Sequence, residues 1–414
     1  MEPGGPPVKS SARVDRARSV LEARADVPEL QDPVTLPATS ASQHGFLRRH
    51  AGKLLASLII TCGIVVMVRK GGLKFLPEGG DFQAFRERWW TLPAYLLTLT
   101  AMTWFRSVRW RFLLRSIAEV PKTRLFNVSC IGFAAIVLMP FRIGEFVRPY
   151  LVRTPNEQRG RPGAISMTAA TSTIVAERII DGLFVSIVLA LALLFVPTVH
   201  PLPDTVVGIP VSVHHVRMSG YLMLLLFVSA FTTIGVFYFA RSWAHRMTLL
   251  VVGKVSPKLA MKLATLVEKF ADGLHVLRRK DDALGFLGET AVYWGINAVG
   301  MWLLAWGAGV VHADGTAPTF GEACGLMGML SCAILIPGPP GLLGVFQAGV
   351  YAGMTMFYPT SVVTGPGAAY VFLMYASQVL FQLAAGGICL LLDRGGLKAL
   401  EEVDAMVPGA VEAE

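Results

Sequence analysis

The stretch that decides the fold is residues 139–149, which read Met139-Pro140-Phe141-Arg142-Ile143-Gly144-Glu145-Phe146-Val147-Arg148-Pro149. It follows an apolar run over residues 125–139 that resembles the first half of a membrane helix. Pro140 cannot donate a backbone hydrogen bond, so we expect the helix to break there. Ionisable groups at membrane depth are costly and usually face a protein interior or a wet cavity. A broken helix is tolerated only where protein or water satisfies the freed backbone. The stretch therefore predicts the wall of a polar cavity inside a lipid-embedded protein.

The composition is typical of a polytopic helical membrane protein. The 414 residues are 53% hydrophobic and only 16% charged, with a mean hydropathy of +0.55, whereas a soluble domain carries about 25% charged residues. The formal net charge of +9 comes from Lys and Arg beside apolar runs. There they set orientation and contact anionic lipid head groups. We therefore expect membrane lipids as partners and no nucleic acid. The basic and aromatic residues at 104–112 are expected in an interfacial belt.

The cysteines and histidines predict neither a disulfide framework nor a metal site. All five cysteines lie in apolar segments, and none forms a Cys-x-x-Cys pair or has a His at ligand spacing. The chain has no Walker A motif. We therefore expect no metal and no cofactor.

Hydropathy and charge predict an all-α fold of about six full spans plus two re-entrant broken hairpins. The full spans are expected near residues 54–68, 91–108, 164–196, 221–240, 286–311 and 368–392. The span at 164–196 is interrupted by charged residues and too long for one simple crossing. The positive-inside rule places both termini in the cytoplasm of a multi-pass protein of the cytoplasmic membrane. Residues 1–45 are expected to be a disordered cytoplasmic tail, 46–395 the transmembrane domain and 396–414 an acidic C-terminal tail. The mixed charges of the loop at 69–90 leave its side open.

The two hairpins are expected to enter from opposite faces. Residues 125–139, Pro140 and Gly144 have basic residues on both flanks, which predicts a hairpin from the cytoplasmic face. An ordinary crossing with an unusually basic outer loop is the alternative. Residues 320–358 have no Lys or Arg on either flank, which predicts a hairpin from outside. The residues expected at its turn are Pro337, Pro340, Gly341, Gly344 and Gln347. Each half of the chain thus has two spans, a hairpin and a span, and such inverted repeats are typical of transporters.

Two clusters of ionisable residues are the candidate substrate-binding site. The first consists of Arg142, Glu145 and Arg148. The second consists of Glu177, Arg178 and Asp181. Arginine presents a fork of donors that suits phosphate oxygens. Two carboxylates on one helix face need a cation between them. Both clusters are open to two interpretations, which are substrate binding and internal pairing that holds the fold together.

The motifs around these residues resemble those of a known family. They read Pro140-x-Arg142-x-Gly144-Glu145-x-x-Arg148-x-x-Leu151, Glu177-Arg178-x-x-Asp181 and Pro337-x-x-Pro340-Gly341-x-x-Gly344-x-Phe346. Together they resemble the lysylphosphatidylglycerol synthase transmembrane-region family, also called flippase-like, over about residues 45–395. The resemblance implies an inner-membrane protein that handles lipids or lipid-linked head groups across the bilayer. Full-length synthases add a soluble aminoacyl-transferase domain, which we do not expect here. Gln347 stands where the family often has Glu, which weakens a charge-dependent role for that position.

A lipid translocase is the leading functional expectation, with no catalytic residue assigned. The arginines would attract a lipid phosphate, and the carboxylates would balance them or contact a cationic head group. The rival is a membrane glycosyltransferase acting on a polyprenyl-phosphate-linked sugar, with Glu177 and Asp181 as its carboxylate pair. No loop is long enough for a nucleotide-sugar domain, so a transporter is favoured over an enzyme. A third alternative is a partner protein that only stabilises a lipid-synthesis or glycosylation complex.

Overall fold

The computed structural model contains only helices and loops in the part of the chain that it describes. The described residues are 63, 66, 74–115, 117–139, 144–153, 164–199, 212–239, 246, 247, 250, 256, 261, 280–335 and 339–392. No strand occurs among them, and the all-α prediction is confirmed. The expected first span at 54–68 lies almost wholly outside these residues, and the tails expected at 1–45 and 396–414 lie wholly outside.

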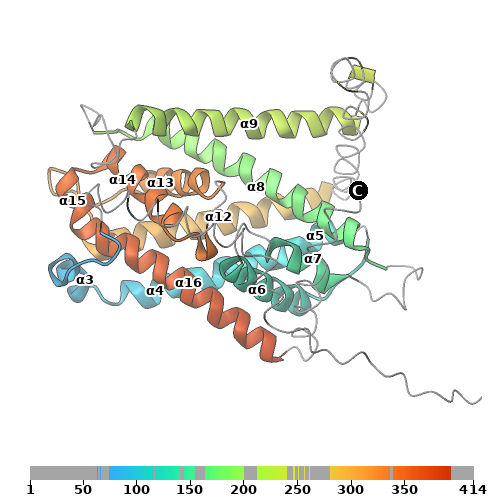
Figure 1. Ribbon diagram of the computed structural model, residues 1–414, viewed down its shortest axis with the longest axis horizontal. Helices are drawn as coiled ribbons and strands as arrows, with labels where there is room; N and C mark the ends of the chain where they lie inside the picture. Colours follow the sequence, from blue (N-terminus) through green and yellow to red (C-terminus); the bar gives the residue numbers. More distant parts are fainter. Residues whose placement is uncertain are drawn as a thin grey trace, which may run out of the picture. The chain divides into compact units, whose positions relative to one another are not determined.

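The helices follow one another along the chain as labelled in Figure 1. The first part forms η1 (Gly79–Phe82), α3 (Gln83–Glu87), α4 (Thr91–Val108), α5 (Trp110–Leu114), α6 (Lys122–Leu138) and α7 (Val147–Val152). The middle forms α8 (Met167–Phe195), α9 (Val213–Phe239) and α12 (Lys280–Ala308). The last part forms α13 (Phe320–Ala333), η5 (Pro340–Leu342), α14 (Val345–Phe357), α15 (Thr360–Thr364) and α16 (Pro366–Leu392).

The long helices coincide with apolar runs of the sequence. α4 covers residues 91–108, and α9, α12 and α16 cover the runs expected near 221–240, 286–311 and 368–392. Among the described residues, α8 and α16 are long and apolar enough to cross a membrane. Their outward faces carry apolar side chains such as Leu194 and Leu391, which are 64% and 82% exposed. Exposed apolar surface of this kind is expected where lipid, not water, surrounds a helix.

α8 forms within the apolar run that was expected to be a span at 164–196. Glu177, Arg178 and Asp181 lie inside one continuous helix of 29 residues. Ser166 begins this helix by accepting a hydrogen bond from the amide of Ala169, as an N-cap side chain does. The charged run does not break the helix because arginines of other elements pair with both carboxylates.

The first break in the chain lies between α6 and α7. The described residues resume at Gly144, whose missing side chain leaves room for the backbone of Ala135 and Ile136 in α6. Only glycine lets two backbones approach this closely. α7 then packs against both α6 and α8. Pro140 and Arg142, which were expected at this turn, lie outside the described residues.

The second break lies between α13 and α14. Gly341 and Gly344 have positive φ angles of 66° and 87°, which other residues adopt only at a cost. α14 then packs back along α13, with Gly349 beside Ala333. The two helices form a helical hairpin within the segment 320–358. Pro337 lies outside the described residues.

The packing partners of the two halves correspond. α6 packs against α16, and α13 packs against α8. α4 contacts α6, and α12 contacts α13. α7 contacts α8, and α14 contacts α16. The helices can be matched as α4 with α12, α6 with α13, α7 with α14 and α8 with α16. Each of these contacts then has a counterpart between the matched helices. α4 and α12 pack directly on each other. The correspondence is the pattern that an internal repeat produces.

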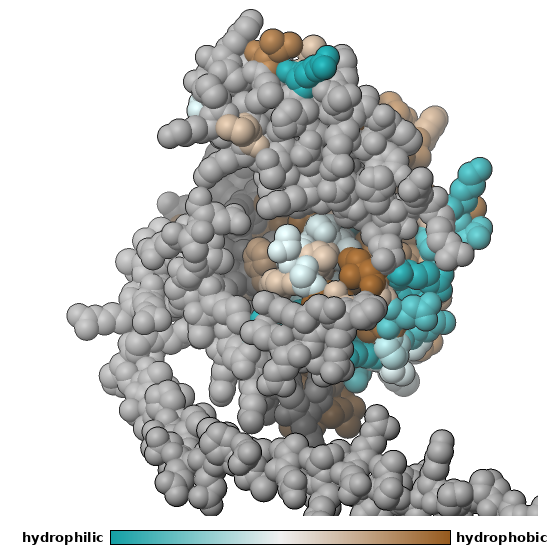
Figure 2. Space-filling view, turned by 90° about the vertical axis from the view of Figure 1, so that its right-hand side faces the viewer, coloured by the Kyte–Doolittle hydropathy of each residue, from teal (hydrophilic) through white to brown (hydrophobic). Residues whose placement is uncertain are grey.

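α4 and α12 run in opposite directions. Arg88, just before α4, donates to the carbonyl of Trp306 near the end of α12 at 2.7 Å. Arg111 in α5 pairs with Glu289, near the start of α12, at 2.6 Å. α3, α14 and α15 accordingly lie toward one end in Figure 1, and α5 and α7 toward the other. Figure 2 looks onto the second end, where hydrophilic side chains gather along one edge.

Candidate functional site

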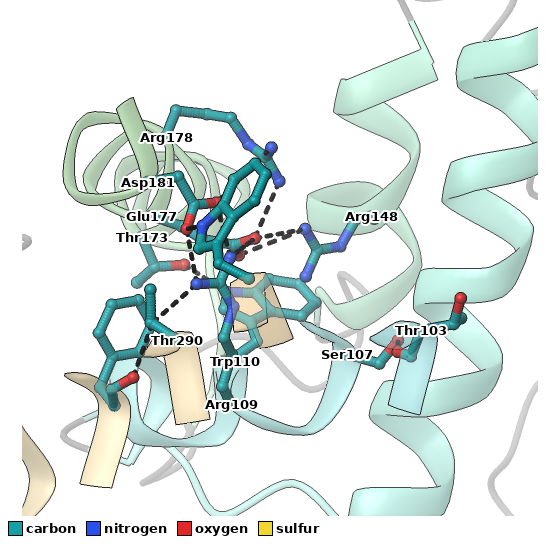
Figure 3. A network of polar contacts seen from close by, with 12 residues as sticks. Thr103, Ser107, Arg109, Trp110, Arg148, Thr173, Glu177, Arg178, Asp181 and Thr290 are labelled. Carbon is teal, nitrogen blue, oxygen red and sulfur yellow. Dashed lines mark hydrogen bonds and ion pairs between the residues drawn. The ribbon is translucent and has the colours of Figure 1, made fainter. Parts of the chain in front are cut away.

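Two carboxylates of α8, Glu177 and Asp181, lie at the centre of a buried network of polar contacts (Figure 3). They stand four residues apart and therefore project from one face of the helix. Their side chains are 0% and 6% exposed. Two like charges on one buried face are unfavourable unless cations neutralise them. The cations are Arg109, Arg148 and Arg178, and we call these five residues the arginine–carboxylate network.

Arg109, at the junction of α4 and α5, binds Asp181 with both ends of its guanidinium. Nη1 donates to Oδ1 and Nη2 to Oδ2, each at 2.6 Å. Nη1 also donates to the hydroxyl of Thr290 at 2.8 Å, and Nη2 to Oε1 of Glu177 at 3.2 Å. Such two-pronged pairing adds geometric specificity to the charge attraction. Arg109 thus ties α8 to α4 and α12.

Glu177 receives two further arginines. Nη1 of Arg148, in α7, donates to both of its carboxylate oxygens at 3.3 Å. Nη2 of the adjacent Arg178 donates to Oε1 at 2.8 Å. The missing side chain of Gly132, in α6, leaves room for the stem of Arg148. Arg148 therefore links the two sides of the first break, because it follows the turn and its stem packs at Gly132, which precedes it.

Aromatic rings cover the buried guanidinium groups. Arg109 lies 4.9 Å from the ring centre of Tyr293, and Arg148 lies 4.5 Å from that of Trp110. Such contacts stabilise desolvated cations. Arg109 and Trp110 are both 0% exposed. The expectation that residues 104–112 form an interfacial belt is therefore wrong for these two residues, which belong to the core.

A cavity of about 170 Å³ adjoins the network, and we call it the inner cavity. α4, α6, α8, α12, α13, α14 and α16 all contribute to its wall. Its charged lining residues in the described part of the chain are Arg106 and Arg178. Its polar uncharged lining includes the amide side chains of Asn297, Gln378 and Gln382. The cavity thus lies between the two halves of the chain and presents positive charge.

A second cavity of about 470 Å³, the side cavity, lies on the other side of Arg178. Glu145 and Asp181 line it together with apolar residues such as Phe146, Met223 and Phe227. Arg178, Trp294, Ser331 and Ile334 line both cavities. A guanidinium that borders both spaces can contact a ligand in either one.

The structure brings together four of the predicted site residues in one network, which are Arg148, Glu177, Arg178 and Asp181. Glu145 lines the side cavity with Arg178 and Asp181, while Arg142 lies outside the described residues. Gly341 borders the inner cavity, and Pro340 stands beside it in η5. Gln347 does not line either cavity, and its side-chain oxygen accepts a hydrogen bond from the amide of Gly344 at 2.7 Å. It therefore caps α14.

Sequence reasoning missed Arg106 and Arg109. They are three residues apart at the end of α4, so both point toward one side of the helix, and both face the network or its cavity. Their neighbours Trp104 and Trp110 made the segment look like an interfacial belt. The available signal was charge balance, because two carboxylates on α8 required a cation whose position in the sequence was not defined.

Among the described residues, no group of three or more His, Cys, Asp or Glu could hold a metal ion. Cys130, Cys324, Cys332 and Cys389 are free thiols. The polar chemistry of the described site is therefore that of guanidinium, carboxylate, amide and hydroxyl groups.

Comparison with known proteins gives one match. A sequence model of the lysylphosphatidylglycerol synthase TM region matches residues 20–386, which covers most of the chain and ends within α16. No curated protein and no solved structure matches. The match, the apolar helices and the motifs at the two breaks agree on a membrane protein with a lipid-related function. The chain belongs to the lysylphosphatidylglycerol synthase transmembrane-region family.

Proposed function

We propose that the protein is a flippase-like lipid translocase, which moves a phospholipid or lipid-linked head group across the cytoplasmic membrane. The observation that carries the proposal is a buried arginine–carboxylate network beside two cavities that share Arg178. Arginine forks suit the oxygens of a lipid phosphate. Ionisable groups inside membrane proteins are expensive and usually mark a substrate pathway.

Arg178 is the residue past which the head group moves. Its side chain is 27% exposed, whereas those of Arg109 and Arg148 are 0% and 1% exposed. Arg109 and Arg148 hold Glu177 and Asp181 in place, and Arg178 remains accessible from both cavities. A phosphate handed from one cavity to the other stays in contact with this guanidinium, so its charge is never left alone in an apolar environment.

The two breaks act as gates in an inverted repeat. The exchanged packing of α6 with α16 and of α13 with α8 supports this proposal. The turn after α6 lies beside basic connections and the turn after α13 beside connections without Lys or Arg, so the hairpins enter from the cytoplasmic and outer leaflets respectively. Both chain termini are then cytoplasmic. Small movements of either hairpin open the inner cavity toward one leaflet.

The glycosyltransferase alternative has less support from the site. A general base or a metal ligand needs a carboxylate with free lone pairs. Asp181 already accepts both ends of Arg109, and Glu177 is shared by Arg109, Arg148 and Arg178. Carboxylates held in this way balance charge, which is the role that a translocase requires of them.

Reconstitution into liposomes tests the proposal. The purified full chain is inserted into vesicles that contain fluorescent phosphatidylglycerol and a polyprenyl-phosphate-linked sugar. Dithionite then bleaches the outer leaflet, and mass spectrometry follows any new product. Lipid movement without product supports a translocase. Product without movement would overturn the proposal in favour of the glycosyltransferase. The absence of both movement and product would overturn it in favour of a stabilising partner protein.

A further inference from the structure

The connection between α12 and α13 carries a titratable ring that lines neither the inner cavity nor the side cavity. His312 follows the end of α12, and its side chain is 22% exposed. Its Nε2 lies 2.6 Å from Oε1 of Glu322, in the first turn of α13. Its Nδ1 lies 3.1 Å from the carbonyl oxygen and 3.0 Å from the hydroxyl oxygen of Thr316. Both ring nitrogens therefore have polar partners.

Each oxygen that faces the ring accepts a hydrogen bond. A carbonyl oxygen and a carboxylate oxygen have no hydrogen to donate. The hydroxyl of Thr316 has a single hydrogen, which it donates to Oδ1 of Asp314 at 2.7 Å. A neutral imidazole carries a hydrogen on only one nitrogen, whereas the imidazolium carries one on each. The surroundings of His312 therefore fit the protonated ring, because only that form donates from both nitrogens.

Glu322 joins the two ends of the second hairpin, which consists of α13 and α14. Its Oε2 accepts a hydrogen bond from the amide of Thr319 and one from the hydroxyl of Tyr358, each at 2.8 Å. Thr319 is the N-cap of α13, and Tyr358 is the C-cap of α14. The ring centre of His312 also lies 5.3 Å from that of Tyr358. One imidazolium thus holds the connection against the base of both helices.

The charges around the ring favour its protonation. On the described elements packed against it, the titratable groups that face it are Glu322 of α13, Asp314 of its own connection and Tyr358 after α14. Burial of the ring opposes protonation, but the hydrogen bond and charge of Glu322 outweigh it and raise the pKa of His312. The proton is therefore bound below the ordinary pKa of about 6.5. It is lost as pH rises through the higher folded value.

We propose that His312 is a proton-sensitive latch at the base of the second hairpin. Its protonated ring ties the connection to Glu322 and, through Glu322, to Tyr358. Loss of the proton removes the charge and leaves one ring nitrogen without a hydrogen opposite an accepting oxygen, so the connection opens more often and α13 and α14 move more easily. The latch goes beyond the proposed translocase function, and only its effect on lipid movement rests on that function.

Thiol labelling in the same connection tests the latch. Val310 is 1% exposed, so in a cysteine-free background Val310→Cys reacts only when the connection opens. The exposed Ala313→Cys is the reference, and dividing the first labelling rate by the second removes the pH dependence of the thiol itself. At about pH 6 this ratio should be about tenfold higher in His312→Gln than with His312 present, because a charged hydrogen bond is lost. At about pH 9 the two ratios should be equal.

His312→Lys is the second variant, because lysine keeps its charge over this pH range. Its labelling ratio should stay low at both pH values. Equal ratios for His312 and His312→Gln at about pH 6 would overturn the latch. A ratio for His312→Lys that rises with pH as the wild-type ratio does would also overturn it, since pH would then act on another group.

Lipid movement in vesicles separates the latch from the translocase. Labelled phosphatidylglycerol should cross up to about tenfold faster with His312→Gln than with wild type at about pH 6, and at the same rate at about pH 9. The predicted labelling ratios without lipid movement in either protein would contradict the translocase function and leave the latch intact. Equal rates of movement at about pH 6 in two folded proteins would contradict the effect of the latch on movement.

Discussion

Arg106 and Arg109 stand three residues apart on the same stretch of chain and have opposite surroundings. Arg109 pairs with Asp181 through both ends of its guanidinium. Arg106 contacts the faces of Phe133 and Tyr293 and has no described carboxylate within ion-pair distance. Breaking a buried pair leaves the remaining charge uncompensated, whereas removing an unpaired charge removes a cost. The first arginine therefore stabilises the fold, and the second is available to a ligand.

The same substitution at the two positions should separate these roles. Arg109→Met should lower the free energy of unfolding by about 3–5 kcal/mol, because Asp181 loses its main partner. Arg106→Met should leave the stability of the ligand-free protein unchanged or raise it, since methionine fills the space without a charge. Thermal unfolding of both purified variants in detergent provides the comparison. Equal losses of Tm would show that Arg106 is as much a part of the fold as Arg109.

The sequence predicts that the carboxylates of α8 need cations, but it does not predict which arginines supply them. Glu177 and Asp181 stand on one face of an apolar helix, so a cation between them was required by elementary electrostatics. Arg178 was available nearby in the sequence. Arg109 could not be identified, because an arginine next to tryptophan at a helix end has the same pattern whether it meets lipid head groups or a buried aspartate from another helix. Only the packing of α4 on α12 and of α5 on α8 distinguishes the two.

At the scale of elements, the two broken segments use different local devices. The chain after α6 passes so close to Ala135 and Ile136 that Gly144 is required. The chain before α14 turns through Gly341 and Gly344, and Gln347 caps the new helix. Sequence alone placed both breaks correctly, because Pro and Gly interrupt apolar runs there. It did not show that Gln347 acts as a cap, since that depends on the turn geometry.

Gly144→Ala should destabilise the first break. The added methyl would overlap the backbone of α6, which cannot move without disturbing the helix. We expect a loss of about 1–3 kcal/mol in unfolding free energy, as for other overpacked sites. Gly295→Ala in α12 is the matched control, because nothing lies within 4 Å of the position that its Cβ would take. It should be neutral or stabilise the helix by up to about 1 kcal/mol. Chemical denaturation of both variants decides whether the close approach is essential.

A second element-scale device lies at the start of α13. In the connection between α12 and α13, Nε2 of His312 lies 2.6 Å from Oε1 of Glu322, whose other oxygen accepts from Tyr358 at 2.8 Å. Burial of the ring opposes protonation, but the hydrogen bond and charge of Glu322 outweigh it and raise the pKa of His312 above its ordinary value. A raised pKa means that the folded state binds the proton more tightly than the unfolded state.

The contribution of His312 to stability should therefore depend on pH. It is fully present below the unfolded pKa of about 6.5 and is lost as pH rises through the higher folded value. The difference in Tm between wild type and His312→Gln should be large at about pH 6, which is below the unfolded pKa of His. It should be small at alkaline pH. A difference that stays constant across this range would mean that the protonated ring is not what holds the connection.

At the scale of the whole molecule, the helices of the two halves have corresponding packing partners. The sequence predicted the long helices because lipid-facing apolar runs have a clear length and the flanking charges a clear sign. It could not predict that α6 packs on α16 and α13 on α8. α6 contacts the last long helix of the second half and α13 contacts that of the first, and both cavities are lined by residues from both halves.

Cysteine accessibility tests the inverted arrangement. In a cysteine-free background, single cysteines replace two exposed residues, Glu119 before α6 and Thr360 after α14. A membrane-impermeant maleimide applied to intact cells should label Thr360→Cys. It should label Glu119→Cys only after the membrane is opened. Labelling of both positions from the same side would rule out hairpins that enter from opposite leaflets.

The most direct test of the central claim is the rate at which labelled phosphatidylglycerol crosses vesicles that contain wild type, Arg178→Gln or Arg111→Gln. Both arginines form ion pairs, with Glu177 and Glu289 respectively, but only Arg178 borders the cavities. We predict that Arg178→Gln slows movement by about tenfold or more, because a hydrogen bond to a charged group is worth about 1.5–3 kcal/mol, and that Arg111→Gln does not change the rate. Movement at the wild-type rate in a folded Arg178→Gln protein would contradict the claim that the buried network carries the lipid head group.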